Sequence, residues 1–135
     1  ILLGDGGSDP EEWGVWSDGG YSQITLPVSN IKEQIELHFG IQGYTPKEAP
    51  LLEVDVYANN VFKDKWKFQR DNSQGVRSLN IAPDLIAKGN GVLNIDFRIH
   101  EPRSPKQLGR GDDNRLLGIG ISSLQIKLLD TQDKQ

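Results

Sequence analysis

The sequence predicts an all-β domain: an antiparallel β-sandwich of about eight strands with jelly-roll topology. Apolar and polar residues alternate with a period of two in several short segments, which is the pattern of strands with one buried face. Gly, Pro and Asn residues that favour turns separate these segments. Helix signals occur in one short segment only, so an all-β fold is favoured over a mixed one.

Five segments carry the alternation, and we expect their apolar residues to form the core. In chain order these residues are Ile24, Leu26 and Val28; Ile35, Leu37, Phe39 and Ile41; Leu52, Val54 and Val56; Trp66 and Phe68; and Leu93, Ile95, Phe97 and Ile99. Their polar neighbours should face outward. The alternating lysines Lys63, Lys65 and Lys67 are typical of an edge strand protected against aggregation.

The connections between these segments also have sequence signals. Residues 58–61 contain two adjacent asparagines, which tolerate the positive φ of a tight hairpin turn. Residues 83–88 begin with Pro and precede Gly89, so they predict a short helical turn. Residues 101–115 are polar and contain Pro and Gly, and therefore predict a long surface loop.

The last strand changes phase. Its first apolar set is Leu117, Ile119 and Ile121, and its second set is Leu124, Ile126 and Leu128. A β-bulge at residues 122–123 would reset the phase and turn both sets toward the core. Because the first and last strands of such sandwiches often lie near one another, we expect residues 13–17 to approach residues 119–128.

Composition limits the possible functions. Of the 135 residues, 36% are hydrophobic and 25% charged, and the net charge of −4 argues against nucleic acid or an anionic membrane as the partner. No apolar run approaches the roughly 18 residues of a membrane-spanning helix, so we expect no direct membrane insertion.

The chain has no Cys, which excludes disulfides, and no Met, which suggests a domain excised from a larger protein. We expect one domain over residues 1–129 and a frayed tail over residues 130–135.

Residues 9–19 (DPEEWGVWSDG) hold two of the three tryptophans. Trp13 and Trp16 are separated by an odd number of residues, so on a regular strand they point to opposite faces. The outward one could stack on a sugar ring while Glu12, Asp18 or Tyr21 binds hydroxyl groups. Alternatively, both rings are buried as part of the fold.

Two histidines lie in the outward phase of their strands. His38 and His100 have polar neighbours in the same phase, among them Asp55, Asp96 and Arg98. If their strands pair, these residues could line one ligand-binding face; otherwise they form ordinary solvated surface. The residues that we expect to contact a sugar are Glu12, Trp13, Trp16, Tyr21, His38, Tyr57, Arg98 and His100.

Two other kinds of site have weaker support. Residues 4–12 form an oxygen-rich run between Asp5 and Glu12 that could hold a structural calcium ion, but it lacks the spacing of an EF-hand loop. Glu11, Glu12, Asp112 and Asp113 could supply a glycosidase pair only if two of them flank a cleft. We therefore expect no catalytic residue, no cofactor and no other metal site.

Three short motifs occur together in this chain: residues 9–19, residues 104–109 (SPKQLG) and residues 112–121 (DDNRLLGIGI). Their order resembles that in a β-sandwich accessory domain, like a carbohydrate-binding module in fold, of bacterial cell-surface polysaccharide glycosyltransferases and phosphoglycerol-transferase-like membrane proteins. The resemblance implies a non-catalytic module tethered at the bacterial cell envelope by a membrane-associated parent. We expect Arg115 to pair with Glu12 or Asp113 and to pin the long loop onto the first strand.

The function that these observations favour is binding or positioning a polysaccharide or glycolipid acceptor for the parent protein. A different class of function remains open, namely a structural or protein-interaction domain that packs on the parent or dimerises. An exposed apolar patch without a groove would indicate the second function, and an exposed aromatic beside a polar cleft would indicate the first.

Overall fold

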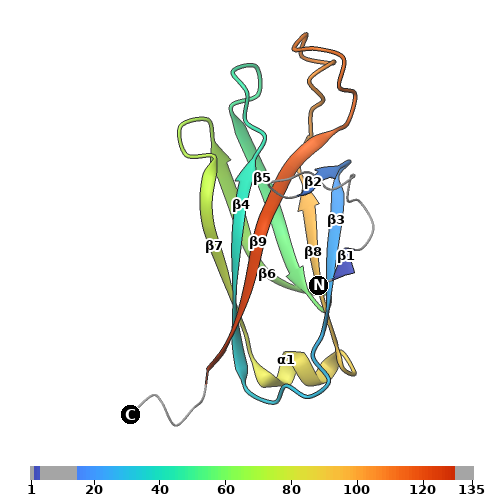
Figure 1. The fold of residues 1–135 in the computed structure, drawn as a ribbon, viewed down its shortest axis with the longest axis vertical. Helices are drawn as coiled ribbons and strands as arrows, with labels where there is room; N and C mark the ends of the chain where they lie inside the picture. Colours follow the sequence, from blue (N-terminus) through green and yellow to red (C-terminus); the bar gives the residue numbers. More distant parts are fainter. Residues whose placement is uncertain (1, 4–14, 130–135) are drawn as a thin grey trace.

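The computed structural model describes residues 2–3 and 15–129 and confirms the all-β sandwich (Figure 1). Its five-stranded sheet has the order β1-β3-β8-β5-β6, and its four-stranded sheet has the order β2-β9-β4-β7. All strand pairs are antiparallel. The elements are β1 Leu2–Leu3, β2 Val15–Asp18, β3 Tyr21–Pro27, β4 Gln34–Gly43, β5 Leu51–Ala58, β6 Val61–Gln69, β7 Gln74–Ile81, α1 Pro83–Lys88, β8 Val92–Ile99 and β9 Leu117–Leu129.

The core lies between the two sheets and contains the apolar residues that the alternation predicts. At its centre Phe39 of β4 packs edge-on against Trp66 of β6 and Phe97 of β8, with ring centroids 5.6 and 5.7 Å away. Edge-to-face packing of this kind stabilises beyond simple area burial. The rings join the two sheets, so the outward residues of each sheet are held on a rigid support.

The predicted hairpin and bulge are both present. Asn59 and Asn60 have φ values of 45° and 68° and form the two-residue turn between β5 and β6. In the pairing of β4 with β9, Gly40 is opposite Ser123 and Ile41 is opposite Ile121, so Ser122 is the extra residue of a bulge.

One part of the core prediction is wrong. Leu124 packs against the core, but Ile126 and Leu128 are 42% and 53% exposed. The reason is that, among the described strands, only β4 pairs with β9 beyond Ile121. Beyond that point β9 is an edge strand among the described residues, so its inner face lacks full cover.

The two ends of the sandwich differ (Figure 1). At one end lie the predicted helix α1 and the hairpin turn, where buried Asn59 donates hydrogen bonds to Leu85 O and Val92 O. The loops that follow β4, β6 and β8 project from the other end, including the predicted loop between β8 and β9. Within the described part of the chain, no helix has the length and apolar character needed to span a membrane.

The first and last strands lie side by side, as expected. Val15 is opposite Ile121 and Asp18 is opposite Leu117. Buried Ser17 accepts a hydrogen bond from the Ile119 amide at 2.9 Å. The 130–135 segment, which we expected to be a frayed tail, lies outside the described residues.

Candidate functional site

Four of the predicted contact residues lie together on the outer face of the five-stranded sheet. Tyr21 of β3 is opposite Arg98 of β8, and Arg98 is in turn opposite Asp55 of β5. Tyr57 lies two residues along β5 from Asp55, and His100 lies two residues beyond Arg98. Residues two apart on a strand point to the same side, so these side chains share one face.

The apolar part of this face is an aromatic pair that we call the aromatic platform, Tyr57 and Phe62. The two rings meet edge-on with centroids 5.6 Å apart. The Arg98 guanidinium lies over the Tyr57 ring, with Cζ 4.1 Å from the ring centroid. Phe62 is 53% exposed, so the platform presents aromatic surface to solvent.

Beside the platform a hydrogen-bond network holds the polar side chains in place. The Tyr21 hydroxyl donates to Asp96 Oδ1 at 3.0 Å. The Gln23 amide donates to the same oxygen at 2.8 Å and to the Tyr21 oxygen at 3.2 Å. Asp96 is buried, so this network is less screened by water than an exposed one would be.

Asp55 occupies the centre of the face. His100 Nε2 is 2.9 Å from its Oδ2, and Lys65 Nζ is 3.9 Å from its Oδ1. Oδ1 is buried, and among the described residues it has no hydrogen-bond donor. This oxygen therefore has an unused capacity to accept a hydrogen bond.

A polar hollow continues this face at the loop end. It has a volume of about 430 Å³ and lies between the loop after β4 and the segment after β8. Its charged and polar lining comes from Glu48, Glu53, His100, Glu101 and Arg103. The Lys67 ammonium lies 3.8 Å from Glu53 Oε2, so the edge strand β6 places a positive charge next to one of these lining residues.

Two other predicted residues, His38 and Trp16, lie on strands of the other sheet. His38 is on β4 in the opposite sheet, where it contacts Glu36 and Ser78, so the shared face that we envisaged for His38 and His100 is wrong. Trp16 is on β2, opposite Gly120 of β9 in the four-stranded sheet. Glu12 and Trp13 lie outside the described residues.

Phe62 is a residue that the sequence analysis missed. A signal for it exists in the hairpin: a two-residue turn at Asn59 and Asn60 makes Ala58 opposite Val61 and Tyr57 opposite Phe62. Since Tyr57 is outward, its partner across the hairpin must be outward as well.

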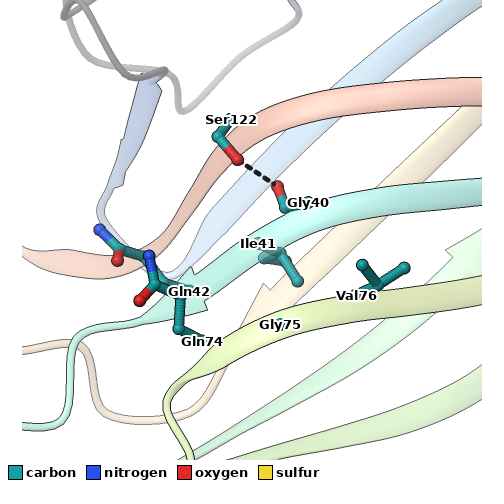
Figure 2. A pocket seen from close by; sticks show the side chains of 7 residues that line it. All are labelled: Gly40, Ile41, Gln42, Gln74, Gly75, Val76 and Ser122. Atoms are coloured by element: carbon teal, nitrogen blue, oxygen red, sulfur yellow. Dashed lines mark hydrogen bonds between the residues drawn. The ribbon is translucent and has the colours of Figure 1, made fainter.

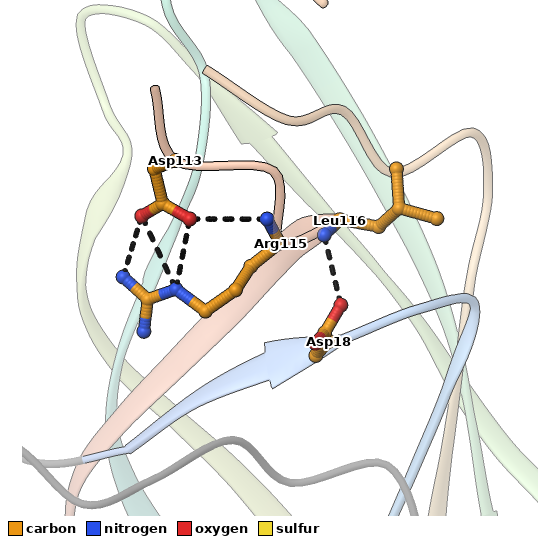
Figure 3. A network of polar contacts seen from close by, with 4 residues as sticks. All are labelled: Asp18, Asp113, Arg115 and Leu116. Carbon is orange, nitrogen blue, oxygen red and sulfur yellow. Dashed lines mark hydrogen bonds and ion pairs between the residues drawn. The ribbon is translucent and has the colours of Figure 1, made fainter. Parts of the chain in front are cut away.

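The long loop is fixed by a polar network near β2 (Figure 3). The Arg115 guanidinium donates to both carboxylate oxygens of Asp113 at 2.7–3.1 Å, which confirms one of the two predicted partners. The connection to β2 is made by Asp18, which accepts a hydrogen bond from the Leu116 amide at 2.9 Å. The hydrogen bonds from Arg115 hold the pKa of Asp113 below its ordinary value.

The structure gives no support to the metal and hydrolase alternatives in the part that it describes. Among residues 2–3 and 15–129 no three His, Asp or Glu side chains come close enough to hold a metal ion. Residues 4–12, the possible calcium run, lie outside this part, as do Glu11 and Glu12 of the possible glycosidase pair. Asp113 is paired with Arg115.

Neither a family model nor a curated protein matches the sequence. Several solved structures are similar in fold. The CBM36-1 domain of a multidomain xylanase from the hindgut metagenome of Trinervitermes trinervoides has a TM-score of 0.53 and 13% identity, over 95% of this chain and 90% of that one. A CBM35 from Paenibacillus barcinonensis has a TM-score of 0.52 and 11% identity, over 95% and 92%.

The same fold also occurs within a much longer protein. Dimeric latent PorU from Porphyromonas gingivalis has a TM-score of 0.53 and 11% identity, over 93% of this chain but 11% of that one. At such low identities the likeness establishes the fold alone. The chain is therefore a jelly-roll sandwich of the kind found in carbohydrate-binding modules.

Proposed function

We propose that this domain is a non-catalytic module that binds a polysaccharide on the outer face of its five-stranded sheet. The observation that carries the proposal is the aromatic platform, in which exposed Phe62 packs against Tyr57 and the Arg98 guanidinium lies over the Tyr57 ring. The fold likeness to modules from a xylanase and from Paenibacillus supports the same function.

The chemistry of the face suits a sugar chain. The CH groups of a pyranose ring pack against an aromatic surface, which the platform offers. Hydroxyl groups can then bond to Tyr21, Gln23 and Asp55, whose polar atoms adjoin the platform. The face is shallow and the chain must lose freedom on binding, so we expect weak affinity, on the order of millimolar to micromolar.

We further propose that the module serves a bacterial cell-envelope protein that modifies glycans, where it positions a polysaccharide or glycolipid acceptor. This part rests on the three motifs that resemble an accessory domain of glycosyltransferases and phosphoglycerol transferases. The motif of residues 112–121 contains the pair of Asp113 and Arg115, and its Leu116 amide donates to Asp18 in the motif of residues 9–19. The Lys106 amide, in the motif of residues 104–109, donates to Asp113 O. Their contacts support a shared role in folding.

Affinity gel electrophoresis tests the binding proposal. The native protein is run through gels that contain xylan, glucomannan, β-glucan, galactan or a bacterial capsular polysaccharide, and at least one should retard it. Phe62→Ala should weaken that retardation at least about fivefold, because one stacking contact is worth roughly 1 kcal/mol or more.

The matched control is Leu128→Ala. Leu128 has the same exposure as Phe62, 53%, but lies on the other sheet. Its truncation should leave retardation unchanged. If no polysaccharide retards the wild-type protein, or if both variants lose binding equally, the outer face of the five-stranded sheet is not the site.

A second candidate function is supported by one observation. Ile126 and Leu128, two residues apart, are exposed on the part of β9 that pairs only with β4 among the described strands. An apolar strip on a sheet edge favours packing against another protein surface, such as the rest of the parent. Sedimentation velocity of Leu128→Glu against wild type tests whether the strip forms a dimer.

A further inference from the structure

The outer face of the four-stranded sheet has a hollow of its own, with a volume of about 380 Å³ (Figure 2). It lies over β4 and β7, with Ser122 of β9 at its border. Gly40 belongs to the lining and is opposite Val76 on one side and Ser123 on the other. The hydroxyl groups of Ser122 and Ser123 fill the space that a side chain at Gly40 would take. This volume is within the usual range for small-ligand sites, roughly 300–1,000 Å³.

Two glutamines supply the polar groups of this hollow. Gln42 of β4 is opposite Gln74 of β7, and Figure 2 shows both amides at the same end of the hollow. Neither amide has a hydrogen-bond partner among the residues that the structure describes. Each amide has two N–H donors and one carbonyl acceptor, so the pair can bind adjacent hydroxyl groups.

The rest of the lining is apolar or already bonded. Val76 is 63% exposed and forms one wall. Ser122 Oγ donates to Gly40 O at 3.2 Å, which fixes the hydroxyl at the border with a lone pair left to accept. The residues that line the hollow carry no charge. A ligand with an apolar side, several hydroxyl groups and no net charge matches this lining.

We infer that this hollow is a second carbohydrate site, which takes a neutral sugar ring. The ring's CH surface lies against Val76, and its adjacent hydroxyl groups bond to the amides of Gln42 and Gln74. The site is on the opposite sheet from the aromatic platform, so it does not depend on the first site. A module with one site on each sheet can hold two glycan segments at once, which raises its avidity for a polysaccharide.

Side-chain amide NMR tests this inference directly. ¹⁵N-labelled full chain is titrated with neutral hexasaccharides of glucose, xylose, mannose and galactose, each to about 20 mM, a range in which a dissociation constant of a few millimolar is measurable. We expect at least one to shift the side-chain amide signals of Gln42 and Gln74 in a saturable way. The double variant Gln42→Ala/Gln74→Ala should raise the dissociation constant, measured from the Val76 amide shift, at least tenfold.

Gln125→Ala is the matched control, because Gln125 is an exposed glutamine on the same sheet but does not line the hollow. It should leave the dissociation constant unchanged. The inference is overturned if no hexasaccharide shifts the two glutamine amides, or if the double variant binds as tightly as wild type. Shifts at Phe62 and Tyr57 alone would overturn the second site and leave the first intact, whereas shifts at the glutamines alone would do the reverse.

Discussion

Asn59 shows how one polar residue can fix a whole end of the sandwich. It is buried, has a positive φ of 45°, donates to Leu85 O and Val92 O, and accepts from the Asn94 amide at 2.9 Å. Asn tolerates this backbone conformation better than most residues. The residue therefore links the hairpin under the aromatic platform to α1 and β8.

Replacing Asn59 should therefore lower the stability of the protein. Asn59→Ala removes three hydrogen bonds and places Ala at a positive φ, so we expect a loss of about 3 kcal/mol in the free energy of unfolding. Urea denaturation measures it. Asn60→Gly, at an exposed position with φ 68°, is the control and should change stability by less than about 0.5 kcal/mol. A loss below about 1 kcal/mol for Asn59→Ala would contradict this role.

Asp113 gives a pH-dependent prediction. Because Arg115 lowers its folded pKa, the pair stabilises the protein above the ordinary Asp pKa, about 3.9, and this contribution disappears as the pH falls further. The pair is partly exposed, so its contribution should be below about 1 kcal/mol.

Asp113→Asn should therefore be less stable than wild type at pH 7 and equal to it at pH 2, as measured by urea denaturation. Exposed Asp112→Asn is the control and should match wild type at both values. A difference for Asp113→Asn that persists unchanged at pH 2 would show that charge pairing is not its cause.

Among the elements, β9 shows most clearly what the spacing of apolar residues can and cannot predict. Its bulge at Ser122 keeps Ile119 and Leu124 on the core side although their spacing in sequence is odd. The phase change of the apolar residues was sufficient to predict this bulge. It was not sufficient to predict the exposure of Ile126 and Leu128, because that depends on which strands pair with β9 beyond Ile121, where β4 is the only described partner.

Deleting Ser122 tests the bulge. Without the extra residue, one half of β9 must turn its apolar side chains outward, since a shift of one residue reverses the faces of a strand. We expect a loss of more than about 3 kcal/mol by urea denaturation. Ser122→Ala keeps the register and loses one hydrogen bond, so it should cost about 1 kcal/mol or less. Equal stability of the deletion and the substitution would contradict the assignment.

For the whole molecule, residue periodicity was enough to predict the sandwich, its core and its hairpin, because burial of one strand face leaves a direct pattern in the sequence. Periodicity also showed that His38 and His100 are outward. It could not show which sheet each strand joins, and the two histidines lie on opposite sheets. Strand order depends on contacts between distant segments, which the local pattern does not record.

The candidate site was predicted in part for the same reason. Tyr21, Tyr57 and Arg98 were predicted as sugar-contact residues, and strand order brings them together. The two-residue turn was enough to predict that Phe62 faces outward beside Tyr57. It could not show that Arg98, from a distant strand, packs on the Tyr57 ring. The aromatic platform thus depends on both the local turn and the tertiary strand order.

The measurement that tests the central proposal most directly is the detection of intermolecular nuclear Overhauser effects between a bound oligosaccharide and the protein's aromatic protons. With the best-binding glycan from the gel panel, we expect contacts from sugar ring protons to the Phe62 and Tyr57 rings. Saturable binding with contacts only to residues elsewhere would contradict the proposal that the five-stranded sheet carries the polysaccharide site.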